Sequence, residues 1–163
     1  KTGECIQSGL GAEQIFDQIA ESKNLEVKNA RRRENIHKHI DKYITQESKT
    51  WSVDIKARKK TSRSDSDAQD EWIWIEFQNV RGNLGWLYGE ADNIAFETQD
   101  SFVIVDRKSL IDYVENAVDM AKPVRKSYLA KYKTYQRAGR NDLLTMVELS
   151  KIIENCKHFV WQK

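Results

Sequence analysis

Two aspartates and a lysine have the types and the spacing that phosphodiester hydrolysis requires. Asp54 and Lys56 lie two residues apart in the segment 51–58, where apolar and polar residues alternate. Side chains alternate in a strand, so both are expected on one face. Asp41 precedes a polar turn at 45–50, and a hairpin would bring it beside them. Two carboxylates can hold Mg²⁺ or Mn²⁺ through oxygen, while an ammonium group orients water and offsets negative charge.

Several elements must form for these residues to meet. Ile15, Phe16 and Ile19 recur at helical spacing and predict an amphipathic helix over 12–23, which carries Glu13. From Asn35 the pattern indicates an extended segment, with Ile36, Ile40 and Ile44 on one side and His37, His39, Asp41 and Tyr43 on the other. The polar residues 59–70 predict a loop. Further strands are expected over 72–80, 92–96 and 102–105, and helices over 108–121 and 143–155.

These elements predict one α/β domain over residues 1–163, with a mixed central β-sheet flanked by helices. The core is expected over about 11–121 and a basic, helical C-terminal extension over 122–163. In that extension, helical spacing would gather Tyr128, Tyr132 and Tyr135 into one stripe, used either for packing or for base stacking.

Charge distribution indicates a polyanionic partner. The chain has 27 Lys and Arg against 25 Asp and Glu, so the net charge of +2 says little by itself. The segment 122–140 nevertheless holds seven basic residues and no acidic one, and 56–63 holds five and none. Such clusters favour phosphate contacts. The candidate nucleic-acid-binding residues are Lys59, Lys60, Arg63, Lys126, Lys131, Lys133 and Arg137.

Other classes of protein are disfavoured. Cys5 and Cys156 lie near opposite ends of the sequence, without the spacing of a disulfide scaffold or a zinc site. No apolar run has the length of a membrane span, and the first residues do not resemble a signal peptide. No glycine-rich loop typical of nucleotide binding is present. We therefore expect an intracellular, cytoplasmic protein that does not associate with membranes.

The order of these features resembles the PD-(D/E)XK nuclease superfamily. A helix with Glu13, then Asp41, a turn and Val53-Asp54-Ile55-Lys56 are similar to that family's motif, although Ile40 stands where many members have proline. The resemblance covers about 11–105 and implies a restriction-endonuclease-like core. It also implies that Asp41 and Asp54 bind Mg²⁺ or Mn²⁺, that Lys56 is the catalytic lysine, and that Glu13 joins the metal site.

A second assignment of the motif remains open. Some members replace the lysine with glutamine, and Glu76-Phe77-Gln78 on the strand after the loop could be such a motif, with Asp54 as the first acid. Gln78 would position water without neutralising charge. A site shared between the two assignments is also open.

The resemblance implies a DNA endonuclease that leaves 5′-phosphates, similar to those of phages and mobile elements, which act in a bacterial host. Many members act as dimers, so a homodimer or larger homo-oligomer is compatible with it. Two alternatives remain. The protein could bind nucleic acid through the same basic surface without catalysis, or its basic segment could meet an acidic protein partner. In either case Asp54 and Lys56 would form an ordinary ion pair on a solvated strand face.

Overall fold

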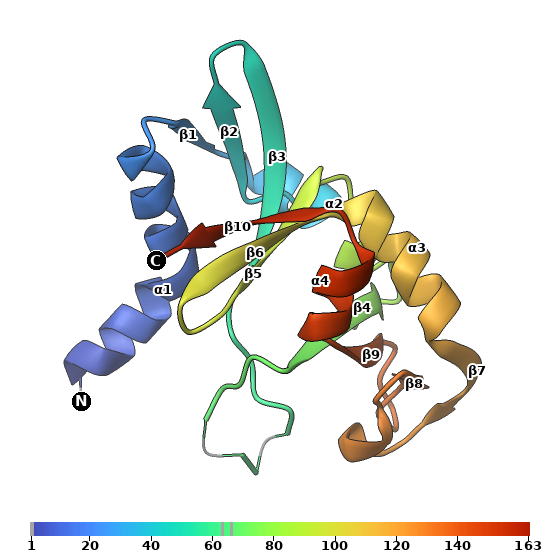
Figure 1. Ribbon diagram of the computed structural model, residues 1–163. Coiled ribbons are helices and arrows are strands. Elements are labelled where there is room, and N and C mark those ends of the chain that lie inside the picture. Colours follow the sequence, from blue (N-terminus) through green and yellow to red (C-terminus); the bar gives the residue numbers. More distant parts are fainter. Residues whose placement is uncertain (1, 63, 66) are drawn as a thin grey trace.

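The computed structural model describes residues 2–62, 64, 65 and 67–163, with side chains described from residue 11 onward. Two β-sheets, each mixed in strand direction, are flanked by helices, which confirms the α/β class (Figure 1). The helices are α1 Thr2–Ser22, α2 Arg32–Lys38, α3 Arg107–Ala117 and α4 Leu149–Asn155, with short 3₁₀ turns at Trp86–Tyr88 and Ser127–Leu129. None of the described helices combines the length and the apolar character needed to cross a bilayer.

The first sheet has six strands in the order β1-β2-β3-β5-β6-β10. All neighbours are antiparallel except β3 and β5, which run parallel. Because the parallel pair is central, β3 is buried on both faces over residues 52–55. The strands are β1 Glu26–Asn29, β2 Lys42–Gln46, β3 Lys49–Lys56, β5 Asn93–Glu97, β6 Ser101–Asp106 and β10 His158–Gln162.

The second sheet has four strands in the order β4-β9-β8-β7. These are β4 Trp72–Gln78, β9 Leu143–Glu148, β8 Lys133–Tyr135 and β7 Asp119–Val124. Pro123 lies in β7, an edge strand, where its missing N–H group costs no hydrogen bond to a second neighbour.

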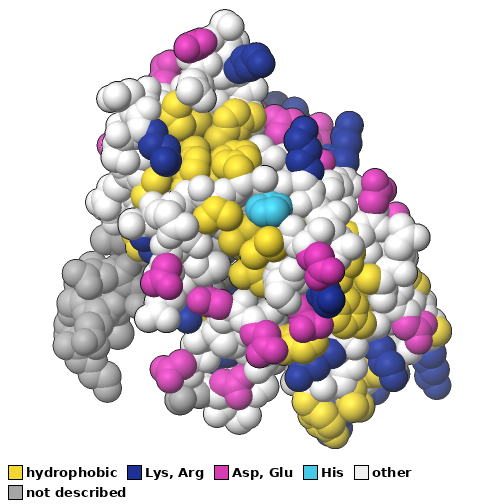
Figure 2. All heavy atoms as spheres, in the orientation of Figure 1, with side chains coloured by type: hydrophobic (Ala, Val, Ile, Leu, Met, Phe, Trp, Pro, Cys, Tyr) yellow, Lys and Arg dark blue, Asp and Glu magenta, His cyan; other side chains and the backbone are white. Residues whose placement is uncertain are grey.

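Hydrophobic clusters cover both faces of the six-stranded sheet. On one face α1 contributes Phe16, Ile19 and Ala20, which pack with residues such as Val53 and Trp161. The other face packs against α3, α4 and β4. Figure 2 shows hydrophobic side chains at the surface where β10 meets the base of the β2–β3 hairpin, and Phe159 and Val160 of β10 are exposed there.

Several predictions about elements are confirmed. The helix of residues 12–23 is the C-terminal part of α1, and the hairpin is formed by β2 and β3 with a tight turn at Glu47 and Ser48. The strands expected over 72–80, 92–96 and 102–105 are β4, β5 and β6. β1, which pairs with β2 at the edge of the six-stranded sheet, was not predicted.

The prediction of an extended segment from Asn35 was wrong in its first half. Residues 32–38 form α2, whose first turn is closed by Glu34 accepting a hydrogen bond from the Arg31 N–H, 3.0 Å long. His39 ends the helix in the left-handed region, with φ 55°. A spacing of four residues fits a strand as well as a helix, so the isoleucines did not distinguish them. His37 and His39 consequently share no strand face with Asp41.

The prediction of a helical C-terminal extension was also wrong. The helix expected over 108–121 ends at Ala117, and the regular elements beyond it are mainly strands: β7, β8, β9 and β10. The helix expected over 143–155 is divided into β9 and α4, because Leu143–Glu148 pairs with β4. Pro123 and the left-handed backbone of Tyr132 and Gly139 oppose a continuous helix over 122–140. No tyrosine stripe forms: Tyr128 is exposed, whereas Tyr132 and Tyr135 contact Trp72 and Trp74.

Candidate active site

The β2–β3 hairpin brings Asp41 and Asp54 together. The backbone N–H of Asp41 donates to the Val53 carbonyl at 2.9 Å, directly before the first paired residues of the hairpin. The Asp41 side chain is held at both oxygens: Oδ2 accepts from the Ile55 N–H at 2.7 Å, and Oδ1 accepts from Nδ2 of Asn35 at 2.6 Å. Asp41 is therefore fixed at the start of β2, beside the middle of β3.

Asp54 is a buried carboxyl group, with 4% of its surface exposed. Oδ1 lies 3.2 Å from Nζ of Lys56, whereas Oδ2 is buried and has no hydrogen-bond partner among the described residues. Burial raises the pKa of Asp54 to about 7, and although Lys56 opposes the shift, neighbouring Asp41 adds to it. The unpartnered oxygen and the adjacent carboxylate make this a position where a cation would be stabilised.

Lys56 is the last residue of β3 and contacts both a carboxylate and an aromatic ring. Its ammonium group contacts Asp54 and also lies 4.9 Å from the ring centre of Trp86, a cation–π arrangement. About a quarter of the side chain is exposed, 27%, so the ammonium group can reach solvent or a ligand. The sequence prediction that Asp54 and Lys56 share a face agrees with this contact.

Glu13 on α1 approaches the same end of the sheet. Its nearest ion partner is Lys42, with 3.8 Å between Oε1 and Nζ. Burial and the charge of Asp41 raise the pKa of Glu13, while Lys42 lowers it. Glu13, Asp41 and Lys42 line a cavity of about 370 Å³ together with Asn29, Ala30, Arg32 and Asn35. Glu13 therefore borders Asp41 rather than the Asp54–Lys56 pair.

Lys42 is a buried cation that sequence reasoning missed. Its Nζ donates to Asp17 Oδ2 at 3.0 Å and to Asn29 Oδ1 at 2.5 Å, and the residue is 7% exposed. A signal was present, because alternation along β2 places Lys42 on the same side as the buried Ile44. Asn35 was missed as well, and nothing in the spacing of the sequence marked it as a partner of Asp41.

Glu76 and Gln78 lie on β4, which belongs to the four-stranded sheet rather than to the sheet of Asp54. Oε1 of Glu76 accepts from the Trp86 N–H at 3.2 Å, and Nε2 of Gln78 donates to the Asn141 carbonyl at 2.5 Å. Both side chains thus already have structural partners. Glu76 nevertheless lines a larger cavity that Lys56 also borders.

The basic candidates fall into two groups. Lys59, Lys60 and Arg137 line the larger cavity, to which they come from the loop after β3 and from the segment after β8. Lys131 lies over the ring of Trp72 at 4.6 Å, and Lys126 and Lys133 are exposed near the second sheet. Arg63 lies outside the described residues. Basic residues distant in the sequence thus meet beside Lys56.

In the part of the chain that the structure describes, no three His, Cys, Asp or Glu side chains already form a metal-binding cluster. Asp41 and Asp54 are neighbouring carboxylates, and Glu13 lies beside Asp41. This donor set suits an ion that keeps several water ligands, as Mg²⁺ does. No protein-family model, curated protein or solved structure matches the chain.

Proposed function

We propose that the protein is a divalent-metal-dependent DNA endonuclease with a restriction-endonuclease-like core, which hydrolyses phosphodiester bonds to leave 5′-phosphates. The observation that carries the proposal is the buried Asp54 carboxyl group, which has one unpartnered oxygen, Asp41 beside it and Lys56 at 3.2 Å. Two carboxylates held together inside a protein repel one another unless a cation or a proton lies between them.

The residues fit Mg²⁺ or Mn²⁺. Asp41 and Asp54 would hold the ion, Glu13 would contribute directly or through water, and remaining positions would be left to water and the substrate phosphate. When bound, the ion would supply Lewis acidity, which promotes ionisation of water and stabilises charge on the phosphate and the leaving oxygen. The Asn35 amide and the Ile55 N–H would keep Asp41 oriented, as partners of metal ligands commonly do.

Lys56 would change partner when substrate binds. Without substrate its ammonium group neutralises Asp54, and with a cation beside Asp54 that role is no longer needed. Lys56 would then donate to the scissile phosphate or to the attacking water, and offset the negative charge that develops there. The ring of Trp86 would limit where the ammonium group moves.

The basic residues would hold the sugar–phosphate backbone. Lys59, Lys60 and Arg137 line the cavity next to Lys56, and Lys126, Lys131 and Lys133 extend the positive surface over the second sheet. The second candidate function is nucleic-acid binding without cleavage. The observation in its favour is that Lys42 and Lys56 already neutralise Glu13 and Asp54.

The test is incubation of the protein with supercoiled and branched DNA in Mg²⁺, Mn²⁺ or EDTA. We expect scission in either metal, none in EDTA, and none with Asp54→Asn. Asp112→Asn, which changes an exposed aspartate on α3, is the matched control and should cleave normally. Salt-sensitive DNA binding without scission of any substrate would favour the second candidate function.

A further inference from the structure

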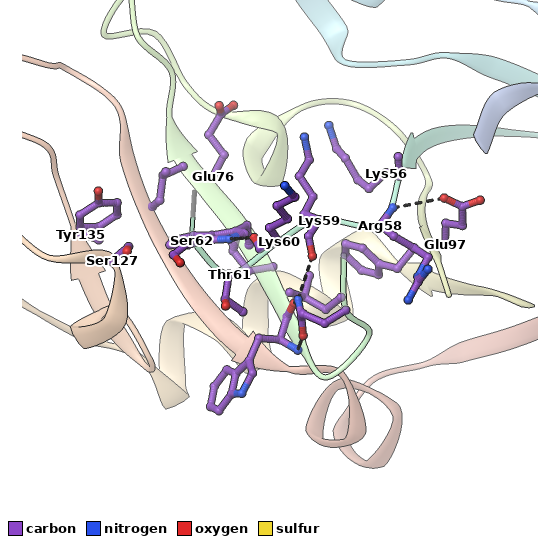
Figure 3. A pocket seen from close by; sticks show the side chains of 18 of the residues that line it. Lys56, Arg58, Lys59, Lys60, Thr61, Ser62, Glu76, Glu97, Ser127 and Tyr135 are labelled. Carbon is purple, nitrogen blue, oxygen red and sulfur yellow. Dashed lines mark hydrogen bonds between the residues drawn. The ribbon is translucent and has the colours of Figure 1, made fainter. Parts of the chain in front are cut away.

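A cavity of about 950 Å³ separates the C-terminal end of β3 from the four-stranded sheet. Its wall begins at Lys56 and continues along the chain to Lys60, and the facing wall includes Trp72, Trp74, Tyr135 and Arg137. Figure 3 shows Lys56, Lys59 and Lys60 between Glu76 on one side and Glu97 on the other. The cavity thus shares one residue, Lys56, with the proposed catalytic site.

The lining carries an excess of positive charge: five basic side chains against two acidic ones among the described residues. Both acids are already engaged. Glu97 accepts from the Arg58 N–H and pairs with Lys163, whereas Glu76 accepts from the Trp86 N–H. Of the five basic side chains, Lys56, Arg58 and Arg137 already pair with Asp54, Asp70 and Asp142. Lys59 and Lys60 are exposed and have no acidic partner within the described part of the chain. Two ammonium groups are therefore available to an anionic ligand.

Aromatic rings stand opposite these lysines. Trp74 is half-buried, and its ring centre lies 5.8 Å from that of Tyr135 at an interplanar angle of 42°. The indole N–H donates to the carbonyl of Lys60 at 3.1 Å, which fixes the ring against the basic segment. In the same lining, Nη2 of Arg137 pairs with Oδ2 of Asp142 at 2.6 Å, and its Nε is buried without a hydrogen-bond partner in the described residues. The wall therefore places fixed aromatic rings opposite the two lysines.

We propose that this cavity binds unpaired nucleotides of DNA, next to the phosphate that is cleaved. The assignment rests on the proposed function for its link to cleavage, although binding itself is a separate property. Aromatic faces on which bases stack, combined with a basic groove that follows the phosphates, are the usual chemistry of single-strand recognition. The volume lies in the range of small-molecule pockets, roughly 300 to 1,000 Å³, which suits one or a few nucleotides rather than a double helix.

The position of Lys56 gives the substrate a direction. Asp41 lines the smaller cavity beside Glu13, Lys56 lines the larger cavity, and Asp54 pairs with Lys56. A DNA strand whose scissile phosphate lies at these three residues would therefore continue past Lys56 into the larger cavity. The preferred substrate would be DNA with a single-stranded end, flap or branch, rather than a continuous duplex.

The experiment measures DNA binding in EDTA with the full chain carrying Asp54→Asn. The probes are a labelled 12-nucleotide single strand, a blunt duplex of the same sequence, and that duplex with a single-stranded flap. We expect the single strand and the flap to bind more tightly than the blunt duplex. Trp74→Ala should weaken binding of the single strand about 5-fold or more, and Trp74→Phe, which keeps a ring for stacking, should retain most of the affinity.

The two lysines provide a second readout that does not depend on the packing of Trp74. The experiment plots the logarithm of the association constant for the single strand against the logarithm of the salt concentration. The combined change Lys59→Ala and Lys60→Ala should reduce the magnitude of this slope by about 1.4, the value for two phosphate contacts of a single strand. Lys49→Ala is the matched control, because Lys49 is an exposed lysine at the far end of β3. It should leave the slope unchanged.

Binding of blunt duplex as tight as that of the single strand, or an unchanged salt slope in the double lysine variant, would overturn the assignment. Cleavage by the protein with Asp54 intact separates the two proposals. If no DNA is cut but single-strand binding depends on Trp74, the cavity assignment stands and the endonuclease proposal fails. If the flapped duplex is cut in Mg²⁺ at a rate that Trp74→Ala does not change, the cavity assignment fails and the endonuclease proposal stands.

Discussion

At the scale of single residues, Asp54 combines a buried, unpartnered oxygen with a neighbouring carboxylate. A carboxyl group in the interior normally has both oxygens satisfied, because an unpartnered buried acceptor costs about 1 to 3 kcal/mol. Asp54 has one oxygen satisfied by Lys56 and the other unpartnered, next to a second carboxylate. Such an arrangement lowers stability in the absence of a ligand, and this cost is expected at a functional site.

Asp54→Asn should therefore stabilise the protein while removing its metal-dependent activity. In EDTA at pH 8, where Asp54 is largely ionised, the neutral amide should raise the free energy of unfolding by roughly 1 to 3 kcal/mol. Lys56 loses its partner but can turn to solvent. Thermal and urea denaturation measure the effect, with Asp112→Asn as the control that leaves stability unchanged. A lower free energy of unfolding for Asp54→Asn would mean that the ion pair with Lys56 outweighs burial.

Lys56→Met should lower the cleavage rate by roughly 100-fold or more, the usual contribution of a residue that acts on a proton or on developing charge. DNA binding in EDTA should change much less, because Lys59 and Lys60 remain. The measurement is the single-turnover rate on a DNA substrate that the unmodified protein cleaves.

Gln78→Ala is the companion variant, because Gln78 replaces the lysine in the other assignment of the motif. It should retain cleavage. Full activity of Lys56→Met together with loss of activity in Gln78→Ala would transfer the catalytic role to β4.

At the scale of elements, the short helix α2 positions the first carboxylate. Its residue Asn35 donates to Asp41 Oδ1, while the helix ends two residues before Asp41 with a left-handed residue that turns the chain into β2. The Asn35 amide thus holds Oδ1 of Asp41, while the Ile55 N–H of β3 holds Oδ2.

Asn35→Ala should reduce metal-dependent cleavage about 10-fold or more, as is common when the partner of a metal ligand is removed. Half-saturation should need more Mg²⁺, because the freed carboxylate must be ordered when the ion binds. The free energy of unfolding should fall by about 1 kcal/mol. His37→Ala, an exposed change on the same helix, is the control. Unchanged Mg²⁺ dependence in Asn35→Ala would show that Asp41 is oriented by the Ile55 N–H alone.

Local pattern could predict an element where its buried residues recur with a single period, either that of a strand or that of a helix. Residues 51–58 alternate strictly, so β3 and the shared face of Asp54 and Lys56 followed from the sequence. The segment 32–44 could not be assigned in this way, because isoleucines four residues apart fit the period of a strand as well as that of a helix. The hydrogen bond from the Arg31 N–H to Glu34 is what favours the helix there. Residues 143–148 form a strand because β4 lies beside them, a contact that no local pattern encodes.

The candidate site could be predicted only in part, for a related reason. The pairing of Asp41 with Asp54 follows from a hairpin, which is local in sequence. The meeting of Lys59 and Lys60 with Trp74, Tyr135 and Arg137 depends on how two sheets face each other. Pairing of β4 with β9, whose partners lie 65 to 76 positions apart, is not visible in the spacing of the sequence. Basic clusters were recognised, but the cavity between them was not.

At the scale of the whole molecule, the pKa of Asp54 links stability to pH. The folded state keeps the Asp54 proton up to about pH 7, whereas the unfolded chain releases it near the ordinary value of 3.8. Between these values unfolding releases a proton, so the contribution of this group to stability is present at low pH and declines as pH rises. The limit is about 1.4 kcal/mol per pH unit.

We expect the free energy of unfolding of the protein in EDTA to fall more steeply between pH 5 and pH 7 than that of Asp54→Asn. Mg²⁺ should stabilise the unmodified protein increasingly as pH rises over this range, because only the ionised carboxylate binds the ion. Urea denaturation at several pH values, with and without Mg²⁺, provides the measurement. Parallel pH dependence in the two proteins would contradict a raised pKa at Asp54.

The strand order has a consequence for how the molecule comes apart. β4 lies in the chain between β3 and β5, and β7, β8 and β9 lie between β6 and β10, so each sheet is assembled from segments that the other sheet interrupts. Neither sheet is a continuous stretch of chain that could retain its structure while the other dissolves. Heating should therefore produce a single cooperative transition, with equal calorimetric and van't Hoff enthalpies, and the two walls of the larger cavity should be lost together.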